Sequence, residues 1–431
     1  MSIKKHIILI FILVAALLSA EEPAVSSRTL TLEDACNLAE KNSISLQKQA
    51  IDLEMDRIRA KSLWAQIFPS ISASGGINYG IPLNKNATST DPAYTATVRL
   101  TLGLNAGLPL TMANISLAYK TSLLNYDQAK RILVNQTSKT YYSLLAQKDY
   151  LNVLEAIMAL ALEQLERDRI ARRSGYIGEL DFLSAQVSSE HAKLAYNRAL
   201  SDYQNALGLF LATLGLTGET VILVGKPEIS RLSLDADALI IEKLSQRPDL
   251  IAQYNEIKRL KNARTETFLF AKGPQVNLTA TWGSSLDNGL GDLIDAGISV
   301  SIPIDPWIPR SKEDQTVKRS NAEYQKALLE LEDMEKNARQ EIRSYADSIS
   351  NTWTEVEIAR LQVNFAQRAY ELAEQAYRRG TMNFLDFETT RNRLIEAQQQ
   401  LLQSELNYKI LVLDLASALN MEEGELVNYS R

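Results

Sequence analysis

The stretch Arg378-Arg379-Gly380-Thr381-Met382-Asn383-Phe384-Leu385-Asp386-Phe387 separates two long runs of helical character. Neither the run before it, residues 310–379, nor the run after it, residues 381–423, contains glycine or proline. Gly380 is expected to adopt the left-handed conformation that ends a helix. Asp386 stands where a carboxylate favours the start of the next helix. The stretch therefore predicts a glycine turn between two long helices.

The same pattern, R-x-G-x4-L-D-F, occurs earlier in the chain around Gly175 and Asp181. The two glycines, Gly175 and Gly380, lie 205 residues apart, and Pro69 and Pro274 have the same separation. Such self-similarity at a fixed offset indicates an internal repeat. A chain of 431 residues has room for two or three average domains, but the duplication favours one body built from two halves.

Residues 1–20 have the character of a secretory signal peptide. Two lysines precede an apolar run over residues 7–18, and Ala20 ends an acceptable cleavage site. The run is short for a membrane span, although an N-terminal anchor helix is the alternative interpretation. Glu21 rather than a cysteine follows the expected cleavage point, which argues against acylation there. The sequence therefore predicts an exported protein.

Charge and composition exclude several classes of function. Without residues 1–20 the chain carries 44 Lys and Arg against 52 Asp and Glu, a net charge of −8 that disfavours nucleic acid as a partner. Cys36 is the single cysteine, and His191 is the one histidine left. The sequence has no zinc-binding cluster, P-loop, nucleophile elbow or dinucleotide-binding turn. We therefore expect no metal, no cofactor and no catalytic residues.

Long helical segments are predicted in both copies of the repeat. In the first copy a capping box at Thr31 opens a helix that is expected to continue to Phe68. Residues 110–174 contain no helix breaker, and a further helix is expected over residues 179–207, fraying past Gly208. In the second copy, Pro248 stands at a favourable first helical position. The residues between the copies, 215–247, are the least regular, with a possible short strand over residues 221–224.

Four segments alternate apolar and polar residues, which is typical of strands. The first runs from residue 71 to 81, and the third and fourth cover residues 276–282 and 296–304. The second alternates most strictly, with Arg99 midway along its polar face. Its apolar residues are Tyr94, Ala96, Val98, Leu100, Leu102, Leu104, Ala106 and Leu108.

The lengths of the segments indicate how each copy is arranged. Two medium helices of roughly 35 residues match one long helix at equal rise per residue, so they can stack end to end beside it. A seven-residue spacing indicates a coiled-coil seam along Phe387, Leu394, Leu401, Tyr408 and Leu415. We divide the chain into a signal peptide (1–20), a first repeat (21–214), a connecting segment (215–247) and a second repeat (248–431).

Four strands do not close a barrel around a pore, and an open sheet edge is not stable in lipid. Several chains are therefore expected to pool their strands, with apolar side chains facing outer-membrane lipid and Arg99 facing a wet lumen. Four aromatic residues near strand ends suit the interfacial girdles of such a barrel: Tyr79, Tyr94, Trp282 and Trp307. The alternative is a periplasmic coiled-coil scaffold without membrane insertion, whose sheet would need a cover for its apolar face.

Three further motifs accompany the two glycine tips: Leu30-Thr31-Leu32-Glu33-Asp34-Ala35, Phe68-Pro69-Ser70-Ile71-Ser72-Ala73 and Arg247-Pro248-Asp249-Leu250. By these motifs and their order the sequence resembles the TolC-type outer-membrane efflux protein family over essentially its whole length after the signal peptide. The resemblance implies a mainly α fold: a duplicated long coiled-coil barrel with a membrane β-hairpin pair, whose four strands contribute to a 12-stranded β-barrel in a homotrimer. It also implies a periplasmic tunnel that opens at its tip on docking to an inner-membrane transporter and its periplasmic adaptor.

The resemblance also implies roles for residues at the tip. Asp386 matches a carboxylate that lines the closed entrance, and Asp181 and Tyr377 match a carboxylate and a tyrosine of the network that holds it shut. Thr389 stands where a second entrance carboxylate is expected, so a single ring is implied. Met382 replaces the arginine of the network.

With that arginine missing, closure is expected to rest on Asp181 and Tyr377, or instead on Arg378 or Arg379. The alternative role for Asp181 and Asp386 is to cap their helices.

The sequence thus predicts a passive, gated export duct. It leaves open whether the duct serves efflux or type I secretion of proteins. A periplasmic hydrolase is a more distant alternative, because Glu179 and Asp181 lie at a helix start without the signature of a catalytic cleft.

Overall fold

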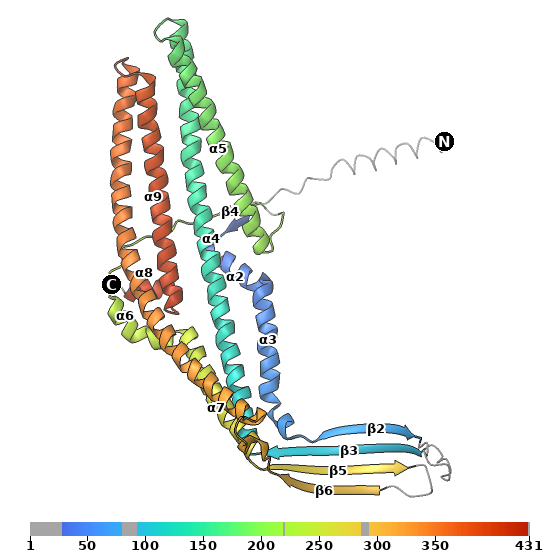
Figure 1. Cartoon of the computed structure of the whole chain (residues 1–431). Coiled ribbons are helices and arrows are strands. Elements are labelled where there is room, and N and C mark those ends of the chain that lie inside the picture. The colour runs from blue at the N-terminus through green and yellow to red at the C-terminus, as the bar shows by residue number, and fades with distance from the viewer. Residues whose placement is uncertain (1–27, 80–92, 219, 286–292, 430–431) are drawn as a thin grey trace, which may run out of the picture. The chain divides into compact units, whose positions relative to one another are not determined.

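Long helices and four paired strands account for most of the chain, as expected for a mainly α fold with two β-hairpins (Figure 1). The computed structural model describes residues 28–79, 93–218, 220–285 and 293–429. The expected signal peptide over residues 1–20 lies outside the described residues.

The chain forms two units, and each contains segments from both copies of the repeat. The first unit comprises the described part of residues 1–43 with residues 133–231 and 351–411. The second unit comprises residues 44–132, 232–350 and 412–431, as far as they are described.

The capping box at Thr31 opens a helix, but this helix is shorter than expected. Thr31 accepts a hydrogen bond from the Asp34 amide, and the Asp34 carboxylate accepts one from the Thr31 amide. The expectation of one helix to Phe68 is wrong, because Ser43 is extended and separates two helices. Asn42 and Ser43 favour hydrogen bonds outside a regular helix, and the Asn42 side chain donates to the Leu214 carbonyl at 2.6 Å. The helices of the first copy are α2 (Leu32–Asn42), α3 (Ile44–Lys61), η1 (Leu63–Ile67), α4 (Leu108–Arg173) and α5 (Glu179–Thr213).

Helix α5 does not fray at Gly208 but continues to Thr213. Phe210 and Leu211 are buried in a hydrophobic cluster that holds the last turns in place. The segment 215–247, expected to be the least regular, contains the strand β4 (Val221–Leu223) and a helix capped by Asp235. The helices from this segment onward are α6 (Ala236–Lys243), η2 (Leu244–Gln246), α7 (Pro248–Lys272), η3 (Asp305–Trp307), α8 (Lys312–Arg378), α9 (Phe384–Ala418) and α10 (Glu423–Tyr429).

The second unit contains an antiparallel sheet whose strands follow the order β2-β3-β5-β6 (Figure 1). Both faces of the sheet keep the expected alternation, with apolar rows such as Ala73, Val98, Trp282 and Ile294. The strands are β2 (Ser70–Asn78), β3 (Ala93–Asn105), β5 (Gln275–Ser285) and β6 (Leu293–Ser301).

The strands end earlier than the alternation of the sequence suggests. Leu108 was expected in a strand but begins α4, because Pro109 suits the first turn of a helix. Ala106 lies in the turn before it, and Ile302 and Ile304 follow the end of β6. No described helix is both long enough and apolar enough to cross a bilayer.

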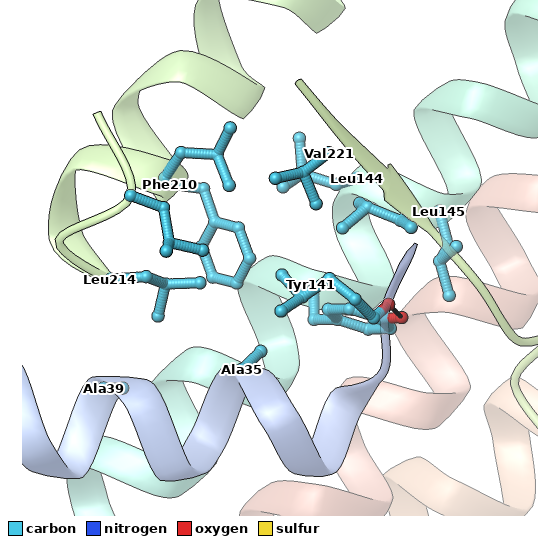
Figure 2. Close-up of a cluster of buried hydrophobic side chains, with 12 residues drawn as sticks. Ala35, Ala39, Tyr141, Leu144, Leu145, Phe210, Leu214 and Val221 are labelled. Carbon is cyan, nitrogen blue, oxygen red and sulfur yellow. Dashed lines mark hydrogen bonds between the residues drawn. The ribbon is translucent and has the colours of Figure 1, made fainter. Parts of the chain in front are cut away.

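In the first unit a short parallel ladder joins β1 (Arg28–Leu30) to β4. Figure 2 shows the buried cluster beside it, where Tyr141 of α4 lies among residues of α2, α5 and β4. The Tyr141 hydroxyl lies 2.8 Å from the Leu30 carbonyl oxygen and 2.6 Å from that of Val224. With a single proton it donates to one carbonyl at a time, and it accepts from the Val224 amide.

Candidate functional site at the helix tips

Two turns of the same construction connect α4 to α5 and α8 to α9. Gly175 and Gly380 both have φ of 73°. The Tyr176 amide donates to the Ala171 carbonyl at 2.9 Å, and the Thr381 amide donates to the Ala376 carbonyl at 3.0 Å. With the glycine amides bonded three residues back, each turn is a Schellman motif. The glycines are required by the backbone conformation alone, because a Cβ would meet no atom within 4 Å.

The two helices after the turns begin differently. Asn383 caps α9: its side-chain oxygen accepts from the Asp386 amide at 2.8 Å, and its side-chain nitrogen donates to the Asp386 carboxylate at 3.0 Å. Gly178 precedes α5 and provides no side-chain cap. Asp386 is exposed and Asp181 is half-buried, each in the first turn of its helix. Both therefore stand where a carboxylate interacts favourably with the start of a helix, and their role at an entrance stays a prediction.

A buried carboxylate beside Tyr377 was not identified from the sequence. The Tyr377 hydroxyl donates to Asp168 Oδ1 at 3.2 Å, and Gln164 Nε2 donates to the same oxygen at 2.7 Å. Asp168 Oδ2 is buried without a hydrogen-bond partner among the described residues. Within the described chain Tyr377 is thus hydrogen-bonded to Asp168 of α4, and the pairing of Tyr377 with Asp181 in closure stays a prediction.

The surroundings shift the pKa values of this pair. Burial raises the pKa of Asp168, although the hydrogen bonds from Gln164 and Tyr377 act in the opposite direction. Burial and the neighbouring Asp168 charge also raise the pKa of Tyr377. The charge of Asp181 contributes to both shifts, so the structure brings Asp181 into the neighbourhood of the pair.

The sequence carries a signal for Asp168 in its spacing. Ile157, Ala161, Gln164 and Asp168 are buried at intervals of three or four residues, as in a coiled-coil seam. A carboxylate at such a position is costly to bury unless it is paired. Asp168 has no counterpart in the second copy, where Ala373 stands at the offset of 205. Asp168 therefore lies outside the duplicated pattern of the two tips.

Aromatic packing surrounds Tyr377 within the α8–α9 hairpin. Its ring stacks on Phe387 with centroids 5.1 Å apart, and it contacts Phe384 edge-on at 5.9 Å. Met382, which replaces the expected arginine, packs against the same cluster. The cluster fixes the Tyr377 ring, so its hydroxyl points to α4 without the help of an arginine.

The arginines offered as alternative partners are engaged locally or exposed. Arg378 pairs with Glu374 one turn earlier on α8, at 2.5 Å. Arg379 is exposed. At the other tip Arg172 bridges the turn to Glu179 at 2.9 Å and lies 4.8 Å from the Phe182 ring. No described contact joins Arg378 to Asp181 or Tyr377, and its role in closure stays a prediction.

A second buried polar cluster, also missed from the sequence, lies between α5 and α9. Arg391 Nη2 donates to Ser188 Oγ at 2.7 Å, and Ser188 Oγ donates to Glu388 Oε1 at 2.8 Å. Arg391 also forms an ion pair with Glu388. The three residues border a groove of about 940 Å³ that is otherwise lined mainly by apolar side chains of α4, α5 and α9, together with Asp181 and His191.

The residues expected at the membrane are all exposed. Tyr79 follows β2, while Tyr94 and Trp282 lie near the ends of β3 and β5 that adjoin residues 80–92 and 286–292. Trp307 lies in η3, beyond the opposite end of the sheet, with Lys272 Nζ 4.8 Å from its ring centroid. The two levels are compatible with two aromatic girdles, which stay a prediction. Among the described residues no three His, Cys, Asp or Glu side chains are placed to hold a metal ion.

Comparisons with known proteins agree with this architecture. Residues 35–215 and 239–421 match the family model of the outer membrane efflux protein. The probable efflux pump outer membrane protein TtgC of Pseudomonas putida is 25% identical over 410 residues, which cover 88% of this chain and 80% of TtgC. The outer membrane protein TolC of Escherichia coli is 20% identical over 371 residues, which cover 82% of this chain and 74% of TolC.

The fold also matches solved structures. The CmeC outer membrane channel of Campylobacter jejuni superimposes with a TM-score of 0.76 at 17% sequence identity. The match covers 93% of this chain and 89% of CmeC. The likeness of fold therefore extends over most of the chain.

Proposed function

Because the chain belongs to the outer membrane efflux protein family, we propose that three copies assemble into one duct with a 12-stranded barrel and a helical tunnel. The chain is an efflux channel of the outer membrane, a passive conduit rather than an enzyme. The resemblance drawn from the sequence is thereby confirmed at the level of the family. The trimer, the partners and the gate described next are proposals for this chain.

The proposal of a trimer rests on the four-stranded sheet. Its apolar face is exposed along its length, as at Ile71, Leu100, Ile298 and Val300. Its outer strands, β2 and β6, each have a neighbour on one side within the described chain. An unpaired edge is not tolerated in a bilayer, because each unsatisfied backbone group there costs several kcal/mol. Pairing of β6 with β2 of the next chain removes both edges, and three chains supply the 12 strands of a closed barrel.

Efflux of small molecules is favoured over secretion of proteins. A relative from Pseudomonas putida is named as the outer membrane protein of a toluene efflux pump, and another as that of an antibiotic efflux pump. By this likeness we assign the chain to a tripartite pump, with an inner-membrane transporter and a periplasmic adaptor as partners.

We assign the gate to the helix tips. The Tyr377–Asp168 hydrogen bond joins the α8–α9 hairpin to α4, and separation of the two would expose a carboxylate that is now buried. Asp386 is exposed in the first turn of α9, where three symmetry-related carboxylates can meet. The hydrogen bond holds the hairpins together, and the Asp386 carboxylates provide a negatively charged constriction.

The proposal is tested by the assembly state of the exported protein. We expect a trimer in outer-membrane fractions that survives detergent without heating and dissociates on boiling, as seen on denaturing gels with and without heat. Ile298→Asp, on the exposed apolar face of β6, should abolish the trimer, whereas the matched change Ser299→Asp on the other face should not. Recovery of the native chain as a soluble periplasmic monomer would overturn the proposal.

A further inference from the structure

The four strands of the sheet carry very little charge. Their sequences contain one basic residue, Arg99 in β3, and one acidic residue, Asp295 in β6. Both side chains are exposed. Charged residues in membrane strands are expensive unless they face water, and those that persist set the electrostatic properties of the pore.

The register of the sheet places these two charges in the same row. Ser72 pairs with Arg99, Arg99 with Thr281, and Thr281 with Asp295. Residues directly opposite each other on neighbouring strands project from the same face. Arg99 and Asp295 therefore share the polar face at one level along the strands, two strands apart. At a strand spacing of about 4.8 Å their backbones are separated by roughly 10 Å.

The neighbouring rows of the same face contain no charge within the strands. One contains Ser74, Thr97, Gly283 and Leu293, and the other contains Ser70, Thr101, Thr279 and Gly297. Arg99 stands midway along β3, so the charged row lies at mid-depth of the sheet. The charges are thus concentrated at a single level of an otherwise neutral polar surface.

We propose that Arg99 and Asp295 form a belt of alternating charge inside the barrel, a selectivity element that favours zwitterionic organic solutes over simple ions of one sign. The proposal rests on the trimeric barrel. In the strand order β2-β3-β5-β6 repeated three times, Arg99 lies on the second strand and Asp295 on the fourth strand of each set of four. Positive and negative charges therefore alternate at every second strand, and the belt is neutral in total.

The alternation has a physical consequence for solutes in the lumen. A net ring of one sign attracts counter-ions and repels co-ions, whereas alternating charges cancel at the pore axis and act near the wall. A solute with opposite charges a few ångströms apart can satisfy neighbouring positions of the belt at the same time. An ion of single charge is attracted electrostatically at one position of the belt and repelled at the next.

The belt is tested by ion selectivity in planar bilayers. Purified trimers are placed in a KCl gradient at about 0.1 M, where the Debye length of roughly 10 Å leaves the belt incompletely screened. All channels carry Asp386→Asn, so that the carboxylates proposed at the tip do not dominate the reversal potential. Arg99→Gln should raise the K⁺ to Cl⁻ permeability ratio and Asp295→Asn should lower it, each by about twofold or more. The double variant should return close to the parent channel.

A matched control and a second readout keep the outcomes distinct. Thr101→Gln, one row away on the same face, should leave the permeability ratio unchanged. In liposomes, permeation of glycylglycine relative to a neutral sugar of similar size should fall in both single variants. The double variant should remain low in this assay although its ion selectivity is restored.

The outcomes separate failure of the belt from failure of the barrel. Conducting trimers in which neither substitution moves the reversal potential, or in which both move it in the same direction, would overturn the belt alone. Unchanged glycylglycine permeation in the variants would overturn its preference for zwitterions. Absence of conducting trimers from the parent protein would overturn the proposed barrel and the belt with it.

Discussion

Asp168 lies buried beside Tyr377 near the tip, and we expect it to make the tip sensitive to pH. Burial raises the pKa of Asp168, so the packed tip favours the protonated form. The groups around it are Gln164, Arg167, Tyr377 and Asp181. Because the folded pKa lies above the ordinary value of 3.8, this contribution to stability is fully present below pH 3.8. It is lost as the pH rises through the raised pKa.

We therefore expect mild acid to hold the tip closed. The open probability of the channel in planar bilayers should fall as the pH is lowered from 7 towards the raised pKa of Asp168. Asp168→Asn removes the titrating group and should flatten this dependence. Both channels should also carry Asp386→Asn, so that the carboxylate proposed at the entrance does not contribute to the response. A pH dependence that survives Asp168→Asn would assign the response to another group.

At the same scale, Asp386 should determine block by multivalent cations. Three carboxylates at a narrow entrance concentrate negative potential and favour cations. Asp386→Asn should remove most of the block by divalent or trivalent cations added on the periplasmic side of single channels. Thr389→Asp adds a second ring one turn further on and should strengthen the block. If cations block the Asp386→Asn channel as strongly as the parent channel, the aspartate serves only the cap that it forms with Asn383.

Sequence reasoning at the residue scale found the tyrosine but not its hydrogen-bonded partner. Tyr377 and Asp181 belong to the duplicated tips, where a repeat draws attention to them. Asp168 and the Ser188–Glu388–Arg391 cluster depend on which faces of separate helices meet. Only the spacing of buried positions along α4 hinted at Asp168, and that spacing becomes informative once the packing partner of the helix is known.

At the scale of elements, the junction of β1, β4 and α4 depends on one hydroxyl. Tyr141 bonds to backbone groups of Leu30 and Val224 inside a hydrophobic cluster. A buried backbone group that loses its partner costs about 1–3 kcal/mol. Removal of the Tyr141 hydroxyl should therefore destabilise the junction mainly through the lost hydrogen bonds, and only slightly through the small loss of packed volume.

Tyr141→Phe should accordingly lower the temperature at which the trimer dissociates. The measurement is a series of denaturing gels of samples incubated at increasing temperatures. Tyr203→Phe is the matched control, because Tyr203 packs at the edge of the same cluster and its hydroxyl makes no hydrogen bond to a described residue. Equal melting of the two variants would mean that the hydroxyl of Tyr141 does not stabilise the junction.

The two faces of β3 should differ sharply in their tolerance of charge. Leu100 lies on the exposed apolar face and Thr101 on the polar face, near the middle of the strand. An arginine facing lipid at mid-depth costs about 2–4 kcal/mol. Leu100→Arg should reduce the yield of trimer in outer membranes, while Thr101→Arg should assemble normally. The reverse result would mean that the faces are assigned the wrong way round.

The elements that sequence predicted well are those with a local signal. Gly175 and Gly380 mark turns by their backbone requirement, and the alternation around Arg99 marks a strand of period two. The break at Ser43 and the helix α6 have weak local signals, so the sequence does not predict them. Strand β1 has three residues, and its partner lies far along the chain. Pairing of this kind is visible only in the folded molecule.

At the scale of the whole molecule, the two copies of the repeat depend on each other. Strand β3 of the first copy pairs with β5 of the second, and both units draw segments from both copies. Duplication in the sequence therefore does not imply halves that fold alone. The repeat boundaries at 21–214 and 248–431 stay a prediction from the sequence, and the contacts divide the chain differently.

A chain ending after residue 214 should fail to reach the outer membrane. It would keep β1 and β3 but lack their partners β4 and β5. We expect this chain to be degraded or to aggregate in the periplasm, which immunoblots of fractionated cells would detect. A chain ending after Asn420 retains every strand, loses only α10, and serves as the control. Stable insertion of the shorter chain would contradict the interdependence of the two copies.

The ladder between β1 and β4 also sets an order of events during biogenesis. Arg28 pairs with Val221, so a chain that emerges N-terminus first exposes β1 long before its partner has left the ribosome and crossed the inner membrane. Closing a loop of this length costs of order 5 kcal/mol in chain entropy. The ladder is therefore a late step, and the sheet must wait longer still, until residue 301 has emerged. Translocation that stalls earlier leaves strands exposed without their partners. Periplasmic holding chaperones and proteases therefore compete for the chain in the period before β6 has been translocated.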